Sequence, residues 1–310
     1  MTENMRLLKR GKVKDLFEVS ENELEFLFTD RISVFDKIIP TDVPKKGETL
    51  CGEASFWFEK SQEIGIRTHF LSMPSPNRMR VKRVDVIPDY NQINSETTNY
   101  LIPAEWISRH YVAGSLYDRL KAGKVDPTDL GFSAGYAPKY GDELPQPILE
   151  QTTKLEEVDR KIGKAELLRI TGLTEDEYEE VLELNLELDE RISNEVERRG
   201  LLHVDGKKEF AFDENRKIMV IDSFGTCDED RFWDIEAYQN GEFKELSKET
   251  VRQYYRSTSY FDQLEDARSK GLEEPDIPPL PPEILEQTKS IYVEMYERIT
   301  GRPFKSGSQV

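Results

Sequence analysis

The chain has 310 residues, of which 37% are hydrophobic and 34% are charged, a balance typical of globular proteins and not of disordered or fibrous ones. Its formal net charge of −18 repels polyanions, so we expect no nucleic acid and no membrane among its partners. An apolar membrane span, an N-terminal signal segment and a CxxC motif are all absent from the sequence, which predicts a cytoplasmic protein with reduced thiols at Cys51 and Cys227.

The chain up to about residue 112 favours short strands. Apolar runs separated by turn residues predict strands at Met5–Lys9, Lys14–Val19, Leu24–Thr29, His69–Ser72, Arg80–Val86 and Trp106–Val112. One helix interrupts them at residues 47–65, where Leu50, Ala54, Trp57 and Phe58 recur at helical spacing before Gly65.

Helices dominate the later part of the chain. Thr174 and Glu177 have the spacing of a capping box and predict a long helix that ends at Gly200. After a proline-rich linker, Pro282 begins a last helix that runs to Gly301. We therefore expect an α+β fold with a β-rich lobe at residues 1–101 and a mixed α/β lobe at residues 102–310.

The first chemically informative stretch is the basic turn around Gly11. Gly11 lies between two strand-like runs, and a glycine there lets backbone amides approach a phosphate. Lys12 and Lys14, two residues apart, supply charge on one side of a strand. A solvated basic hairpin explains the same residues, and the chain contains neither GxxxxGK[ST] nor GxGxxG.

Two further stretches place polar residues among apolar ones. In TDRISVFDKIIP, Asp30, Arg31, Ser33 and Asp36 must bond to one another or to a ligand if they are buried, as in a polar turn or a binding loop. In LIPAEWISRHYVAGS, Glu105 and Arg109 share a strand face, and Gly114-Ser115 begins a helix whose free amides can hold an anion.

The segment VDGKKEFAFDENRKIMVIDS predicts a β-hairpin. A turn at residues 213–216 puts Lys207 opposite Asp222 and Glu209 opposite Val220, so that Glu209 and Asp222 are diagonal neighbours roughly 7–8 Å apart. Their carboxylates could then share a cation. A plain salt bridge between Lys207 and Asp222 is the alternative.

Together these stretches resemble the SAICAR synthetase family. The resemblance is carried by GKVKDLF, TDRISVFD and KKGE, by the pattern LIPxExxxRxxxAGS, and by LPQPILEQTTK, DxKxEF and DRFWD further along the chain. It implies a two-lobed fold with an ATP site between the lobes. It also implies an ATP-dependent ligase that uses Mg²⁺ to join L-aspartate to CAIR, the carboxylated aminoimidazole ribonucleotide, giving SAICAR, ADP and phosphate. A homo-oligomer is left open.

The resemblance also assigns roles to residues of this sequence. Gly11, Lys12 and Lys14 match the nucleotide-phosphate turn, and Ser33 and Asp36 fall in the substrate loop. Arg109, Ser115 and Arg231 match the anchors of the ribonucleotide, Lys207 matches an active-site lysine, and Glu209 and Asp222 match the metal carboxylates.

The sequence departs from the family at several positions of these motifs. Ser223 replaces an acidic residue, and the usual Ser/Thr-Pro-Asp-Ser turn after it is absent; Gly206, Lys208, Ala211 and Val158 also differ. Two other functions are possible alternatives to the ligase. One is a kinase-like phosphotransferase, although the kinase motif HRDxxxxN is missing, and the other is a nucleotide-binding homologue without turnover. We interpret His69, His110 and His203 as structural, and Trp57, Trp106 and Trp233 as core residues.

Overall fold

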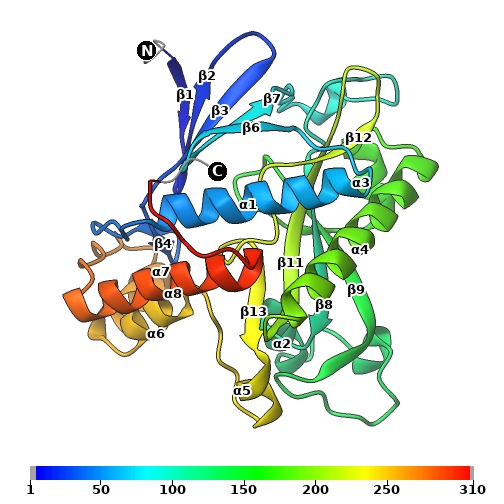
Figure 1. Ribbon diagram of the computed structural model, residues 1–310. Coiled ribbons are helices and arrows are strands. Elements are labelled where there is room, and N and C mark those ends of the chain that lie inside the picture. The colour runs from blue at the N-terminus through cyan, green and yellow to red at the C-terminus, as the bar shows by residue number, and fades with distance from the viewer. Residues whose placement is uncertain (1–4, 308–310) are drawn as a thin grey trace. The chain divides into compact units, whose positions relative to one another are not determined.

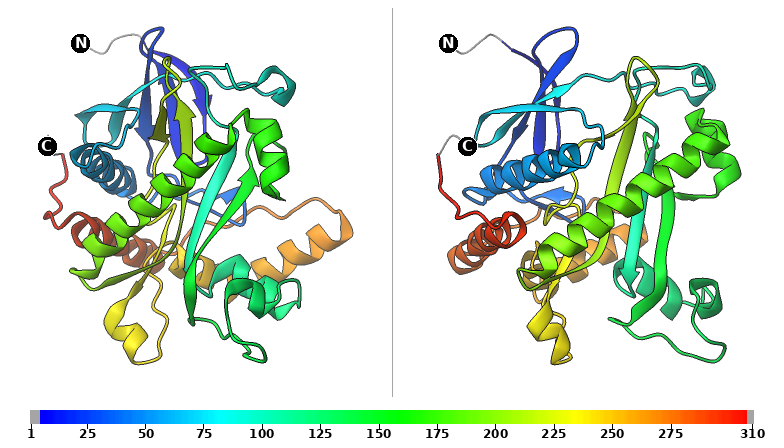
Figure 2. Two further views of the ribbon diagram at one scale, coloured as in Figure 1. Left: turned by 90° about the vertical axis from the view of Figure 1, so that its right-hand side faces the viewer. Right: turned by 45° about the vertical axis from the view of Figure 1, so that its right-hand side comes forward.

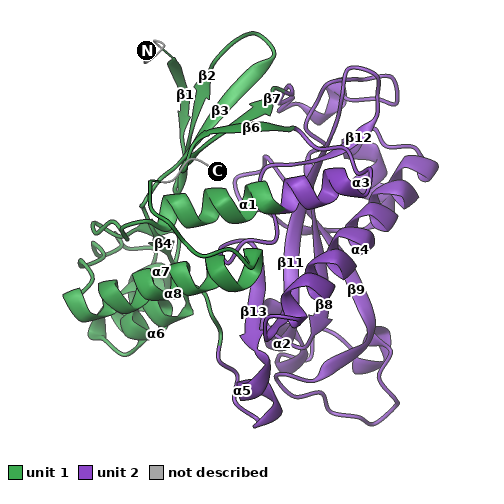
Figure 3. Cartoon of the chain, in the orientation of Figure 1, with its two compact units in different colours: residues 1–56, 70–83, 245–310 green, residues 57–69, 84–244 purple. Residues whose placement is uncertain are grey.

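The computed structural model describes residues 5–307, which form two compact units (Figure 3). Unit 1 comprises residues 1–56, 70–83 and 245–310 as far as they are described, and unit 2 comprises residues 57–69 and 84–244. Compactness thus groups the last part of the chain with the first. The lobes predicted at residues 1–101 and 102–310 divide the chain by secondary-structure content and by the ligands expected for each lobe, and they stay a prediction.

Unit 1 is built on a five-stranded antiparallel sheet in the order β1-β2-β3-β7-β6 (Figure 1). Its strands are β1 (Arg6–Arg10), β2 (Lys14–Glu18), β3 (Glu23–Phe28), β6 (Phe70–Ser75) and β7 (Arg78–Lys82). A separate hairpin pairs β4 (Ser33–Val34) with β5 (Lys37–Ile38). Phe35 and Asp36 between them both have positive φ, 52° and 65°, as a two-residue type I′ turn requires.

The helices that belong wholly to unit 1 lie near the end of the chain. They are α6 (Glu249–Arg256), α7 (Ser259–Lys270) and α8 (Pro282–Thr300), whereas the unit boundary falls within α1 (Lys46–Glu63). Helix α8 begins at Pro282 and is followed by Gly301 with a φ of 70°, which confirms the last predicted helix. The predicted helix at residues 47–65 is confirmed as α1.

Unit 2 is built on a second antiparallel sheet in the order β10-β9-β8-β11-β12, with β13 also paired to β11. Its strands are β8 (Ala104–Tyr111), β9 (Glu143–Thr153), β10 (Lys161–Ile162), β11 (Leu201–Phe212), β12 (Ile218–Ile221) and β13 (Arg231–Asp234). Its helices are α2 (Gly114–Lys121), α3 (Lys164–Thr171), α4 (Glu175–Glu197) and α5 (Ile235–Gln239), with short 3₁₀ turns η1 (Tyr90–Gln92) and η2 (Pro127–Leu130).

Helix α4 crosses one face of this second sheet (Figure 2). The helix begins as predicted, because the Thr174 hydroxyl accepts the Glu177 amide and the Glu177 carboxylate accepts the Thr174 amide. Its apolar stripe, which includes Val181, Leu188 and Ile192, is almost fully buried. The opposite face of the sheet is therefore the one left for polar side chains.

Strand alternation sorts the residues of β8 and β11 between these two faces. Lys208 of β11 bonds to Asp189 of α4 and so marks the covered face. Lys207 and Glu209, its sequence neighbours, point to the other face together with Glu105 of β8, to which Lys207 bonds. The arrangement places His110 on the side opposite Arg109, as the sequence indicated, because His110 also contacts Asp189.

The register predicted for the β11–β12 hairpin is wrong by one residue. Glu209 pairs with Ile221 and Phe210 with Val220, whereas Glu209 was expected opposite Val220 and Lys207 opposite Asp222. The reason is the loop, which has three residues closed by a hydrogen bond from Asp213 N–H to Lys217 O. Arg216 adopts a φ of 54° in this loop, the left-handed conformation common in three-residue hairpins.

The remaining expectations about the core are confirmed within residues 5–307. Trp57, Trp106 and Trp233 are at most 1% exposed. Cys51 and Cys227 are buried free thiols. Among the described residues, no helix combines the length and the apolar character that crossing a membrane would require.

Candidate active site

The basic turn of unit 1 connects β1 to β2. Gly11 N–H donates to Lys14 O at 2.8 Å, and a Cβ on Gly11 would lie only 2.5 Å from that oxygen, so the tight turn requires glycine. Lys12 extends from the turn with a side chain 55% exposed, and its ammonium group lies 2.6 Å from Asp36 Oδ1. Lys14 lies over the rings of Phe26 and Phe28 instead. Two predicted site residues, Lys12 and Asp36, are thus brought together.

The substrate loop predicted at residues 29–40 is tied to this turn. Arg31 donates to Gly11 O at 2.9 Å and bonds to Asp15 Oδ1 at 2.5 Å. Asp30 instead accepts the Gly47 amide at 2.9 Å near the start of α1. The Lys12 hydrogen bond holds the pKa of Asp36 below its usual value. Ser33 lies in β4, half-buried. Part of the polarity of this stretch is therefore structural.

In unit 2, the predicted ribonucleotide anchors gather around Asp205. Its Oδ2 accepts from Arg109 at 3.1 Å and from Arg231 at 3.0 Å. A further nitrogen of Arg109 donates to Ser115 Oγ at 3.1 Å. Gly114 has a φ of 50°, and a Cβ there would lie 2.6 Å from an Arg231 nitrogen. The structure thus brings Arg109, Ser115 and Arg231 together at the N-terminus of α2.

Glu150 of β9 is the second carboxylate of this cationic group. Arg109 donates to it at 2.8 Å, Arg119 at 2.6 Å and Lys161 at 2.7 Å. Burial alone would raise the pKa of Glu150, but Arg109, Lys161 and Arg119 outweigh burial and lower that pKa to about 2. Glu150 therefore stays ionised and holds the cations in place.

A second charged group lies further along the same sheet face. Lys207 is bonded to Glu105 at 2.9 Å and to Glu209 at 3.1 Å, and lies 3.4 Å from Glu229. Lys154 bonds to the same oxygen of Glu209 at 2.7 Å. Burial alone would lower the pKa of Lys207, but the surrounding carboxylates raise it, so its ammonium group stays charged.

Asp222 reaches this group through a turn and not through the strand. It follows the last residue of β12 and adopts a φ of 64°, which redirects its side chain away from the pleated alternation. Burial and the neighbouring Asp222 carboxylate together raise the pKa of Glu209. Glu209 pairs with Ile221, the residue before Asp222, so the two carboxylates belong to adjacent positions of the hairpin although the register that we expected is wrong.

Several functional candidates were missed in the sequence. Asp205 precedes Lys207 by two residues and could have been assigned to the same face by strand alternation. Glu150 and Lys154 lie within LPQPILEQTTK, where no single residue was chosen. Glu229 lies in the irregular segment before β13, and nothing in its spacing indicates its contact with Lys207.

The family model of SAICAR synthetase matches residues 7–267. The chain belongs to the SAICAR synthetase family. The phosphoribosylaminoimidazole-succinocarboxamide synthase of Thermoplasma acidophilum is 51% identical over 298 residues, which cover 96% of this chain and 99% of that protein.

Solved structures agree with this assignment to the SAICAR synthetase family. A SAICAR-synthase from Saccharomyces cerevisiae complexed with SAICAR has a TM-score of 0.76 at 25% identity, covering 98% of both chains. A SAICAR synthetase in complex with ADP has a TM-score of 0.68 at 25% identity, covering 96% of this chain and 99% of that one. The predicted family, α+β fold and enzyme class are thereby confirmed, and neither the kinase-like nor the non-catalytic alternative is favoured.

Proposed function

We propose that the charged face of the unit 2 sheet carries the SAICAR synthetase reaction, in which ATP drives amide formation between CAIR and L-aspartate. The observation that supports this most strongly is the order of groups along β11. Asp205, Lys207 and Glu209 lie on one face of β11, because every second residue of a strand shares a face, and the backbone between the first and the last spans roughly 13 Å. The proposed ribonucleotide anchors around Asp205 and the proposed metal carboxylate Glu209 are therefore neighbours on this face.

The chemistry requires this combination of charges. A carboxylate oxygen of CAIR attacks the γ-phosphorus of ATP, and ADP leaves. The amine of aspartate then attacks the activated acyl carbon and loses a proton, and phosphate leaves with the former carboxylate oxygen. Anionic reactants must approach one another in both steps, so cations at the site lower the barrier.

Glu209 and Asp222 are the residues that we propose for Mg²⁺. Their donor set fits the ion, since both offer the hard carboxylate oxygens that Mg²⁺ binds together with phosphates and water. Burial and, after it, the Asp222 charge raise the pKa of Glu209, and a bound cation would offset both effects. Bound there, Mg²⁺ would neutralise charge on the transferred phosphoryl group.

Arg231 and Ser115 are the proposed anchors of the CAIR phosphate. Both lie at the N-terminus of α2, where free backbone amides also favour an anion. Arg109 donates all three of its nitrogens to Glu150, Asp205 and Ser115, so we assign it to holding these anchors in place. In unit 1, Gly11, Lys12 and Lys14 are the proposed contacts of the nucleotide phosphates, and Ser33 and Asp36 are the proposed substrate-loop residues.

The transfer of an oxygen atom tests this proposal. CAIR labelled with ¹⁸O in its carboxylate is incubated with ATP, Mg²⁺, aspartate and the protein, and the released phosphate is examined by mass spectrometry. We expect one labelled oxygen in each phosphate and the other in the SAICAR amide. Unlabelled phosphate would show that the carboxylate is not the phosphoryl acceptor.

A further inference from the structure

The segment at residues 222–231 supplies the charged face with three side chains from an irregular stretch of backbone. Asp222 directly follows Ile221, the strand partner of Glu209; Glu229 lies 3.4 Å from Lys207, and Arg231 lies 3.0 Å from Asp205. The family's usual turn sequence is absent here, so something else must fix the path of the segment.

Asp230 organises this segment from the covered side of the sheet. Its side chain is fully buried; Oδ1 accepts the Gly225 amide at 2.9 Å and Oδ2 lies 2.8 Å from His203 Nε2. Gly225 O in turn accepts from the Trp57 indole at 2.7 Å. Asp230 directly precedes Arg231, the first residue of β13, so anchoring Asp230 fixes the position from which Arg231 enters the site.

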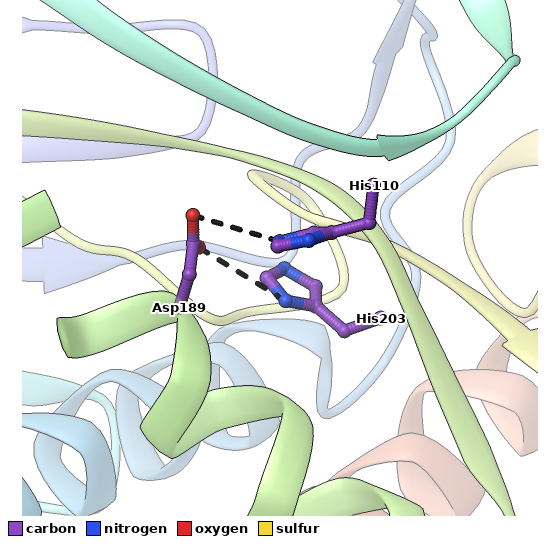
Figure 4. Close-up of side chains that lie close together, drawn as sticks. All are labelled: His110, Asp189 and His203. Atoms are coloured by element: carbon purple, nitrogen blue, oxygen red, sulfur yellow. Dashed lines mark ion pairs between the residues drawn. The ribbon is translucent and has the colours of Figure 1, made fainter. Parts of the chain in front are cut away.

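His203 reaches Asp230 because β11 contains a bulge. The pairing of β11 with β13 shifts between His203 and Asp205, so these residues point to opposite faces although they are two positions apart. Asp205 faces the site, and His203 faces α4. There the other ring nitrogen of His203 lies 3.2 Å from Ser193 Oγ and 4.0 Å from Asp189 Oδ1 (Figure 4).

Gly206 leaves the room that this contact needs. A Cβ on Gly206 would lie 2.2 Å from Asp230 Oδ2 and 3.0 Å from His203 Nε2. Any side chain at position 206 would therefore displace the carboxylate that His203 holds. Gly206 is one of the positions at which the chain departs from the family pattern. It lies against Asp230, which belongs to the altered turn at residues 223–230.

We propose that His203, Gly206 and Asp230 form a clamp that positions the segment 222–231, and with it Asp222 and Arg231, for the reaction. His203 acts through Asp230, so it is a positioning residue. His203 also belongs to a second cluster, in which ligand atoms of His110, Asp189 and His203 lie within 4.8 Å of one another, a spacing that would suit a metal ion. The ammonium group of Lys208 already bonds to Asp189, however, so the cluster contains its own cation.

Four variants test the clamp. His203→Leu removes the contact with Asp230, Gly206→Ala obstructs it, and His203→Gln retains a nitrogen that can donate to Asp230. His110→Leu is the matched control, because His110 contacts Asp189 in the same cluster but is no part of the clamp. Circular dichroism and thermal unfolding establish that each variant folds.

The first readout is hydrogen exchange at the Gly225 amide, which does not depend on the proposed function. We expect at least tenfold faster exchange in His203→Leu and Gly206→Ala, and near-normal exchange in His203→Gln and His110→Leu. Unchanged exchange in both disrupting variants would overturn the clamp. A stoichiometric Zn²⁺ complex that His110→Leu and His203→Leu both abolish would show that the cluster is a metal site instead.

The second readout rests on the proposed function. We expect kcat/KM for CAIR to fall about 10- to 100-fold in His203→Leu and Gly206→Ala, because a misplacement of about 1 Å in an anchoring group can lower the rate about 100-fold. We expect kcat/KM to recover in His203→Gln. An equal loss in His110→Leu would assign the effect to general core damage and contradict positioning. If exchange changes as expected while wild type makes no SAICAR, the proposed function fails and the clamp stands.

Discussion

Lys12 and Lys14 lie two residues apart on the basic turn, yet their ammonium groups have different surroundings. Lys12 is exposed and paired with Asp36, whereas Lys14 lies over Phe26 at 5.6 Å and Phe28 at 5.5 Å. Each ammonium group thus has a defined contact within the turn or its sheet. An exposed ion pair contributes little to folding, so removing Lys12 should leave the fold intact.

Lys12→Ala and Lys14→Ala should each weaken ATP binding about tenfold or more, because a charge-assisted hydrogen bond contributes roughly 1.5–3 kcal/mol. Isothermal titration with ATP measures the effect. The exposed Lys9 of β1 offers a matched control, and Lys9→Ala should bind ATP almost normally. Unchanged ATP affinity in both turn variants, or an equal loss of affinity in the Lys9 variant, would show that the turn does not bind the nucleotide.

Arg109→Lys should raise the KM for CAIR far more than the KM for ATP. Lysine cannot reproduce three donors in fixed directions, so Ser115 and Asp205 lose their support. The control is Arg119→Lys, which disturbs the same Glu150 from α2 but leaves Asp205 and Ser115 in place. Steady-state kinetics with each substrate varied in turn give the comparison, and matching losses for ATP and CAIR would argue against a role of Arg109 in holding the CAIR anchors.

Glu150 makes a testable contribution to stability at acid pH. Its pKa falls from 4.5 to about 2 on folding, so its contribution is complete above about pH 4.5 and is lost as the pH falls towards 2. A shift of this size corresponds to a contribution on the order of 3 kcal/mol. We expect Glu150→Gln to lower Tm at pH 7, with a gap from wild type that closes between pH 4.5 and pH 2.

Thermal scans across this pH range measure that gap. The exposed Glu157, in the loop after β9, provides the control, and Glu157→Gln should unfold with wild type at every pH. A gap for Glu150→Gln that stays constant from pH 7 to pH 2 would show that its carboxylate charge is not what stabilises the fold.

At the scale of elements, the hairpin of β11 and β12 shows what a sequence pattern can predict and what it cannot. The two strands follow from their apolar runs, and the capping box of α4 follows from Thr174 and Glu177. The register does not, because a loop of two, three or four residues fits the same sequence, and each choice moves every partner. The position of Asp222 depends on a left-handed turn that alternation does not predict.

The two carboxylates proposed for Mg²⁺, Glu209 and Asp222, can be tested by substitution. Asn tolerates the left-handed conformation, so Asp222→Asn should fold normally, and Glu209→Gln keeps the shape of the buried side chain. Each should reduce turnover at least 100-fold and raise the Mg²⁺ concentration needed for ATP binding. Calorimetric titrations at several Mg²⁺ concentrations show this, and wild-type Mg²⁺ dependence in both variants would place the ion elsewhere.

At the scale of the whole molecule, an acidic chain concentrates its functional cations in small groups. The ordered motifs predicted both the family and the α+β fold, whereas the expectation of no polyanion partner rests on the net charge of −18 and stays a prediction. The grouping of the last helices with the first sheet was not predictable, because no local pattern reports contacts between residues more than 200 positions apart. Glu150 and Glu229 were missed because their roles come from neighbours on other strands, whereas alternation along β11 could have identified Asp205.

The dependence of ADP release on the two acceptor substrates tests the central claim most directly. The purified protein is supplied with ATP and Mg²⁺, and ADP is followed with CAIR alone, with aspartate alone and with both. We predict steady ADP release only when both are present, with one SAICAR formed for each ADP. Steady release without CAIR or without aspartate, or no release with both, would contradict the ligase function proposed for this chain.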